Sequence, residues 1–139
     1  MTSSTEATGY TVLLYSDDAG VRDRMRTAIG RRPAKDVRVE YVEAATADEV
    51  IRLVDEYEVD LLLLDGEAWP AGGMGIARQL RDEFEDPPTT VVVLARAADR
   101  WLASWSRADA VLVHPLDPVR TAETVADLLR RRTLSATTS

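Results

Sequence analysis

Short apolar runs alternate with amphipathic segments along the chain. The most apolar run covers residues 59–64, where four consecutive leucines lead into Asp65 and Gly66. Such a run is too short to span a membrane and is typical of a strand buried on both faces, in the middle of a parallel sheet. In open α/β sheets, ligands bind outside the carboxyl ends of the strands, which makes Asp65 the first candidate for chemistry.

The remaining apolar runs predict four more strands. Residues 10–15 and 110–113 are compact apolar runs, and residues 89–94 are rich in β-branched side chains, which favours a buried strand. Residues 37–42 alternate apolar and polar side chains and therefore suit a half-exposed edge strand.

Amphipathic segments after these strands predict helices. Apolar side chains recur at helical spacing within residues 21–29, 50–54, 76–84 and 119–129, and residues 99–105 predict a shorter helix. Gly30 and Pro33 end the first helix, whereas Thr46 and Glu49 form a capping box at the start of the second. The last helix starts at residues 117–118 and runs to about residue 132.

This order of elements, β-α repeated five times, predicts an α/β fold. We expect a doubly wound five-stranded parallel sheet in the flavodoxin-like order 2-1-3-4-5, with right-handed crossovers and helices on both faces. The length of 139 residues fits one domain, which we place at residues 10–132. Residues 1–9 and 133–139 are predicted to be disordered tails.

Composition narrows the function classes. Cysteine is absent, which excludes disulfides, zinc-thiolate sites and thiol catalysis. The net charge of −7 argues against nucleic acid as a partner, because phosphate binding needs a basic surface. The sequence has neither a membrane-spanning run nor a signal peptide, so we expect a cytoplasmic protein without membrane insertion.

Three carboxylates are expected at one edge of the sheet. Asp17 and Asp18 follow the first strand and Asp65 follows the third, and these strands are neighbours in the predicted order. Carboxylates so close together repel one another, so either the pKa of one of them is raised or a cation binds between them. Oxygen ligands point to Mg²⁺ as that cation. A carboxylate beside bound Mg²⁺ can act as a nucleophile toward phosphorus. Taken separately, Asp-Asp is also a common helix N-cap and Asp-Gly a common turn.

With these residues in this order, the chain resembles the receiver domain of bacterial two-component response regulators. The resemblance extends from Thr11 to about Leu129. Asp17 and Asp18 match the acidic pair that holds magnesium in that family. Asp65 matches the aspartate that takes a phosphoryl group from a histidine kinase.

The resemblance also implies the rest of the site and its partners. The backbone carbonyl of Glu67 would complete the metal site, and His114–Pro115 falls on the family's Lys-Pro with its cis peptide. The resemblance implies a signalling protein, not an enzyme, that catalyses at most its own phosphoryl transfer. Its partners would be a sensor histidine kinase or another phosphodonor, and a downstream protein that docks on the fourth helix, fifth strand and fifth helix.

Four positions depart from the family pattern. Ala95 replaces the switch Ser or Thr, so the hydroxyl that reports phosphorylation is missing. His114 replaces the lysine, and an unperturbed histidine is mostly neutral at pH 7, although it can still donate one hydrogen bond to a phosphoryl oxygen. Val111 replaces the switch aromatic. Pro70 lies five residues after Asp65 rather than four, which reshapes a loop in which Trp69 could partly cover Asp65.

Two tryptophans stand one turn apart on the short predicted helix. Trp101 and Trp105 fit either a core role or an exposed role, and tryptophan is enriched at interface hot spots. Since we expect a stand-alone receiver, which must act by docking, we interpret these residues as candidate partner-binding positions.

The sequence leaves two main hypotheses open. The first is a single-domain response regulator phosphorylated at Asp65, with Mg²⁺ in the acidic pocket. The second is a phosphorylation-independent pseudo-receiver that acts as a protein-binding scaffold, which Ala95 and Val111 favour. A magnesium-dependent hydrolase fits less well, because those enzymes resemble a strand ending in Asp-x-Asp and this chain has Asp65-Gly66-Glu67 instead. A flavodoxin also fits less well, because the first turn is acidic where a phosphate cradle is neutral or basic.

Overall fold

The chain folds around a parallel sheet in the strand order β2-β1-β3-β4-β5. The structure, a computed structural model, describes residues 7–68, 72–101 and 107–138. The order confirms the predicted doubly wound fold. The strands are β1 (Thr8–Tyr15), β2 (Val37–Ala44), β3 (Leu61–Asp65), β4 (Thr89–Leu94) and β5 (Ala110–Val113).

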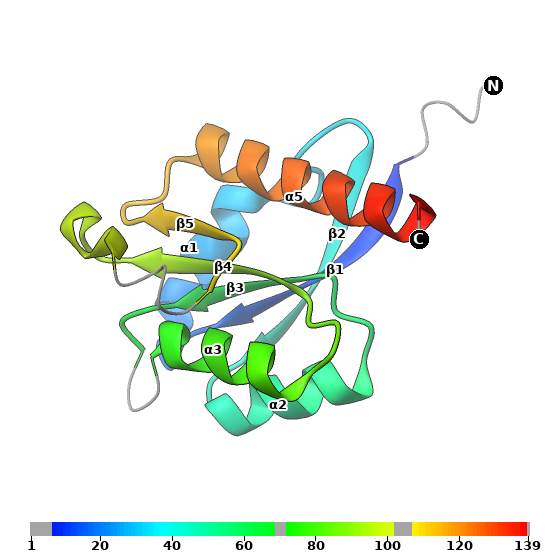
Figure 1. Ribbon diagram of the computed structural model, residues 1–139. Helices are drawn as coiled ribbons and strands as arrows, with labels where there is room; N and C mark the ends of the chain where they lie inside the picture. Colours follow the sequence, from blue (N-terminus) through cyan, green and yellow to red (C-terminus); the bar gives the residue numbers. More distant parts are fainter. Residues whose placement is uncertain (1–6, 69–71, 102–106, 139) are drawn as a thin grey trace.

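Helices cover both faces of this sheet, as predicted (Figure 1). One face carries the first and last helices and the other carries the second and third. The helical elements are α1 (Ala19–Ile29), α2 (Ala47–Glu56), α3 (Gly73–Glu83), the 3₁₀ helix η2 (Ala97–Asp99) and α5 (Pro118–Thr138).

The leucine run forms the centre of the core. Leu61 and Leu63 point to the face that packs against α1 and α5, whereas Leu62 and Leu64 point to the face that packs against α2 and α3. All four are fully buried, which confirms the predicted strand with two covered faces. Because β3 lies between β1 and β4, this burial fixes Asp65 at the central part of the sheet's carboxyl edge.

Local signals set the ends of the helices. The Thr46 hydroxyl accepts a 3.2 Å hydrogen bond from the Glu49 N–H, and the Glu49 carboxylate accepts one of 3.0 Å from the Ala45 N–H, which confirms the capping box. Gly30 ends α1 at φ +76°, a conformation that glycine adopts at little cost. Asp117 accepts a hydrogen bond from the Arg120 N–H and so caps α5.

Regular secondary structure extends beyond both predicted domain ends, residues 10 and 132. Thr8 and Gly9 belong to β1, where they pair with Val37 and Arg38, because an edge partner is available to them. Helix α5 continues to Thr138, past the predicted end at residue 132. The Thr133 hydroxyl bonds the Tyr10 hydroxyl on β1, a contact between this last part of the helix and the sheet, and it also donates to the Leu129 carbonyl one turn earlier in α5. Residues 1–6 and 139 lie outside the described part of the chain.

The segment predicted as a helix over residues 99–105 is only partly described. The 3₁₀ helix η2 ends at Asp99, residues 100–101 are helical, and residues 102–106, including Trp105, lie outside the described residues. Among the described helices, none combines the length and the apolar character that crossing a membrane requires.

Candidate functional site

Asp65 is a buried carboxylate at the carboxyl edge of the sheet. Its side chain is 5% exposed. One carboxylate oxygen, Oδ1, accepts a 2.9 Å hydrogen bond from the backbone N–H of Glu67. The other, Oδ2, accepts a 2.8 Å hydrogen bond from the hydroxyl of Ser16. Each oxygen therefore has a donor, which fixes the orientation of the carboxylate and compensates for part of the cost of its burial.

Ser16 is a site residue that the sequence analysis did not single out. It is fully buried directly after β1, and its hydroxyl also accepts a 3.0 Å hydrogen bond from the Asp18 N–H. The pairing of β1 with β3 sets Tyr15 opposite Leu64, so the next residues, Ser16 and Asp65, are brought together. The sequence signal that could have identified Ser16 is its position directly between an apolar strand and an Asp-Asp pair.

Asp18 has the capping role that the sequence left open. Its Oδ1 accepts a 2.8 Å hydrogen bond from the Gly20 N–H, which caps α1. Its other oxygen remains available, and both Asp17 and Asp18 are exposed. Capping occupies only one lone pair of the carboxylate, so it is compatible with a metal site shared by Asp17, Asp18 and Asp65. That shared site stays a prediction.

The acidic groups act electrostatically on one side chain. Burial raises the pKa of the Tyr15 phenol, and the negative charges of Asp17 and Asp65 raise this pKa further. A phenolate at Tyr15 would be repelled by both carboxylates. Asp17 and Asp65 therefore both lie close enough to act on the same phenol.

Two glycines let the chain pass close to Asp65. A Cβ on Gly73 would lie 2.8 Å from the carbonyl oxygen of Asp65, so the start of α3 packs directly on the end of β3. A Cβ on Gly66 would lie 3.0 Å from the Val93 carbonyl oxygen, which accepts the Gly66 N–H in a 2.8 Å hydrogen bond. The Pro and Gly content of residues 67–73 predicts a loop, whereas in the structure Gly73 starts α3. Trp69 and Pro70 lie outside the described residues.

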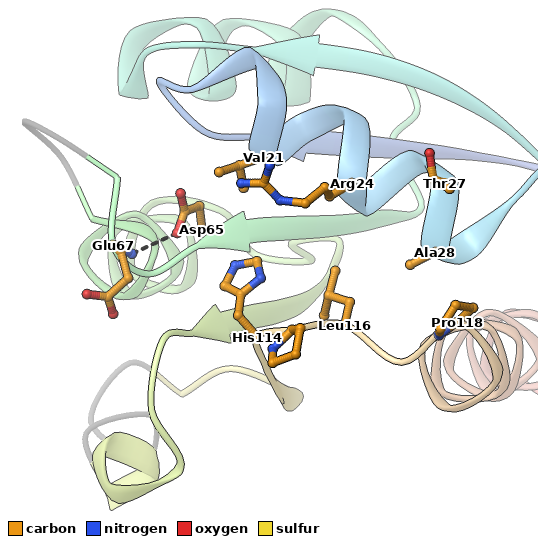
Figure 2. A pocket seen from close by; sticks show the side chains of 10 residues that line it. Val21, Arg24, Thr27, Ala28, Asp65, Glu67, His114, Leu116 and Pro118 are labelled. Atoms are coloured by element: carbon orange, nitrogen blue, oxygen red, sulfur yellow. Dashed lines mark hydrogen bonds between the residues drawn. The ribbon is translucent and has the colours of Figure 1, made fainter.

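A cavity of about 580 Å³ opens beside Asp65, between α1 and the segment that follows β5 (Figure 2). Asp65, Glu67, His114 and Arg24 form its polar end, and the rest is lined by Val21, Thr27 and Ala28 of α1 and by Pro115, Leu116 and Pro118. The imidazole of His114 points toward the end of the cavity that holds Asp65 and Glu67. The peptide bond between His114 and Pro115 is cis, as the resemblance implied.

The other predicted positions within the described residues do not line this cavity. Ala95 directly follows β4 and is exposed, and Val111 is half-buried on β5 opposite Val92. Trp101 is 72% exposed, which is the accessibility that a partner-binding residue requires.

Comparison with known proteins assigns the family. No family model matches the chain. Two proteins from different strains of Mycobacterium tuberculosis, each described as an uncharacterized response regulatory protein, are 48% identical to it over 125 residues. The matched segment is 89% of this chain and 94% of each relative. The chain belongs to the response regulators.

Solved structures of response regulator receiver domains have the same fold. A signal receiver domain from Vibrio parahaemolyticus matches 95% of this chain and 98% of its own length with a TM-score of 0.79, at 17% identity. A CheY-like response regulator receiver domain protein from Methanospirillum hungatei matches 92% and 99% with a TM-score of 0.70, at 20% identity. Response regulators are signalling proteins, which places this response regulator in signal transduction.

Proposed function

We propose that this response regulator accepts a phosphoryl group on Asp65. The observation that supports the proposal most is the Asp65 carboxylate itself, which is buried, held by Ser16 and the Glu67 N–H, and placed at a cavity that opens to solvent. A nucleophile whose orientation is fixed before the donor arrives loses less entropy in reaching the transition state.

The proposed donor is a phosphohistidine of a sensor kinase, or a small acyl phosphate. A carboxylate oxygen of Asp65 forms a bond to phosphorus while the bond between phosphorus and the donor's ring nitrogen breaks. The electron pair of that bond returns to the nitrogen, and a proton on the other ring nitrogen keeps the released imidazole neutral. His114, whose imidazole points toward Asp65 in Figure 2, would donate a hydrogen bond to a phosphoryl oxygen.

The donor set is suited to Mg²⁺. Asp17, Asp18, Asp65 and the backbone carbonyl of Glu67 would hold the ion through oxygen atoms. Within the described residues, no three acidic or histidine side chains gather closely enough to ligate a metal by themselves, so water would complete the shell, as Mg²⁺ prefers. Bound there, the ion would neutralise charge on the phosphoryl oxygens.

A second candidate function is supported by two positions. Ala95 cannot donate the hydrogen bond of the family's switch hydroxyl, and Val111 lacks its switch aromatic ring. A pseudo-receiver would use a docking surface that does not depend on phosphate. The exposed Trp101, next to Arg100 on the edge of the groove formed by β5 and α5, is the candidate position for that contact.

Incubation with acetyl phosphate, followed by intact mass measurement, distinguishes the two functions. We expect wild type to gain one phosphoryl group in the presence of Mg²⁺ but not with EDTA. Asp65→Asn should gain none, whereas Asp55→Asn, an exposed change of equal charge on α2, should behave as wild type. Wild type that gains no phosphoryl group and shows no heat of Mg²⁺ binding would contradict the proposal and leave the scaffold function.

A further inference from the structure

Arg24 is a cationic side chain in the cavity to which the proposed function assigns no role. It comes from α1 and lines the cavity together with Asp65, Glu67 and His114. Figure 2 shows its side chain extending along α1 toward the end of the cavity that holds Asp65. Among the described residues that line the cavity, Arg24 carries the permanent positive charge, because a guanidinium does not lose its proton in proteins.

Helix geometry explains why the guanidinium lies there. Side chains of a helix point back toward its N-terminus, so Arg24 extends over Gly20, four residues earlier. Its Nη1 lies 3.5 Å from the position that a Cβ on Gly20 would take, and Oδ1 of Asp18 lies 3.1 Å from the same position. The guanidinium therefore lies beside the first turn of α1, near the acidic end of the sheet.

The other two arginines of the helix interior are committed elsewhere. Arg22 and Arg26 both form ion pairs with Glu43 on β2. For Arg24, by contrast, no hydrogen bond or ion pair is found within the described part of the chain. Arg24 is exposed and lies near the first turn of the helix, where a cation is unfavourable to the helix dipole and the carboxylate of Asp18 offsets this cost.

Lysine cannot supply this charge. Lys35 is the single lysine of the sequence, and it lies two residues before the start of β2, at the amino edge of the parallel sheet. Asp65 ends β3, at the opposite edge. A phosphoryl group on Asp65 would add negative charge next to Asp17, Asp18 and Glu67, so a fixed cation at this edge has a clear electrostatic use.

We propose that Arg24 binds the oxygens of the phosphoryl group as it is transferred to Asp65 and after its transfer. Arg24 thereby supplies the positive charge that a lysine supplies elsewhere in the family. The inference rests on the proposed function of Asp65. The planar guanidinium offers pairs of N–H donors that match two phosphoryl oxygens, and such charge-assisted hydrogen bonds are stronger than neutral ones.

Two measurements on Arg24→Gln test this role. The rate of phosphorylation by acetyl phosphate, followed by intact mass, should fall about tenfold, the effect of losing one hydrogen bond to a charged group. The affinity for Mg²⁺ alone, measured by calorimetry, should instead rise about twofold, because a neighbouring positive charge has been removed. A disturbed fold would weaken both, so the opposite signs are specific to an electrostatic role.

Matched variants complete the experiment. Arg24→Lys keeps the charge but loses the paired donors, so its rate should lie between those of wild type and Arg24→Gln. Arg31→Gln removes an equal charge from the exposed loop after α1 and should leave the rate unchanged. Equal rates for Arg24→Gln and Arg31→Gln would overturn the role of Arg24 while leaving Asp65 as the acceptor, as would weaker Mg²⁺ binding by Arg24→Gln. A wild type without phosphoryl gain would overturn both proposals.

Discussion

The hydroxyl of Ser16 donates a 2.8 Å hydrogen bond to Oδ2 of Asp65, and so joins the ends of β1 and β3. The same hydroxyl accepts a hydrogen bond from the Asp18 N–H. One buried side chain therefore orients the candidate phosphoacceptor and holds the backbone at the start of α1. This connection ties the acidic pair to Asp65 more directly than their separate positions in the sequence do.

Replacing Ser16 with alanine should affect both stability and reactivity. The change leaves a buried carboxylate oxygen and a backbone N–H without their partner, at an expected cost of about 1–3 kcal/mol in the free energy of unfolding, measured by urea denaturation. Phosphorylation by acetyl phosphate should also slow, because Asp65 loses one of its two orienting contacts. Thr124→Ala on α5 is the control and should leave the phosphorylation rate unchanged. A Ser16→Ala protein as stable as wild type would contradict the role of this hydroxyl.

His114 offers a direct test of the altered site. His114→Lys restores a full positive charge at the polar end of the cavity and should speed phosphorylation several-fold near neutral pH. His114→Ala removes the hydrogen-bond donor and should slow phosphorylation. Both rates come from the same acetyl phosphate assay. Equal phosphorylation rates for wild type, His114→Lys and His114→Ala would show that the imidazole only fills space beside Asp65.

The ion pair between Asp36 and Arg130 predicts a pH dependence of stability. Arg130 donates hydrogen bonds of 3.0 and 2.7 Å to the two oxygens of Asp36, which lowers the pKa of that carboxyl below its ordinary value of 3.8. A lowered pKa in the folded state contributes stability above the unfolded value, and this stability is lost as the pH falls through the folded value. The pair is exposed, so salt should weaken its contribution.

Thermal unfolding of Arg130→Gln measures this contribution. The variant should melt below wild type near neutral pH at low salt, and the difference should shrink as the pH falls below about 4. Added salt should shrink it as well. Arg130 also pairs with Asp127, so Asp36→Asn serves as the control that isolates the contact between α5 and the residue before β2. A difference in melting temperature that does not change with pH would contradict the assignment.

The sequence by itself determined the fold and the position of Asp65. Four leucines without a polar break could be buried only between two layers of helices, and the alternation of strands and helices required parallel strands with their carboxyl ends at one edge. The capping box at Thr46 and the end of the first helix at Gly30 were likewise readable, because these signals depend on residues within a few positions of each other.

Only the tertiary structure decided which side chains surround Asp65. The role of Ser16 depends on the register of β1 against β3, and the placement of Arg24 depends on how α1 lies against the segment after β5. The continuation of α5 to Thr138 depends on a contact with Tyr10, on the first strand. Local patterns specify elements because their periods are short, but contacts between residues far apart in the chain are set by packing. The electrostatic character of the site depends on such contacts between residues far apart in the chain.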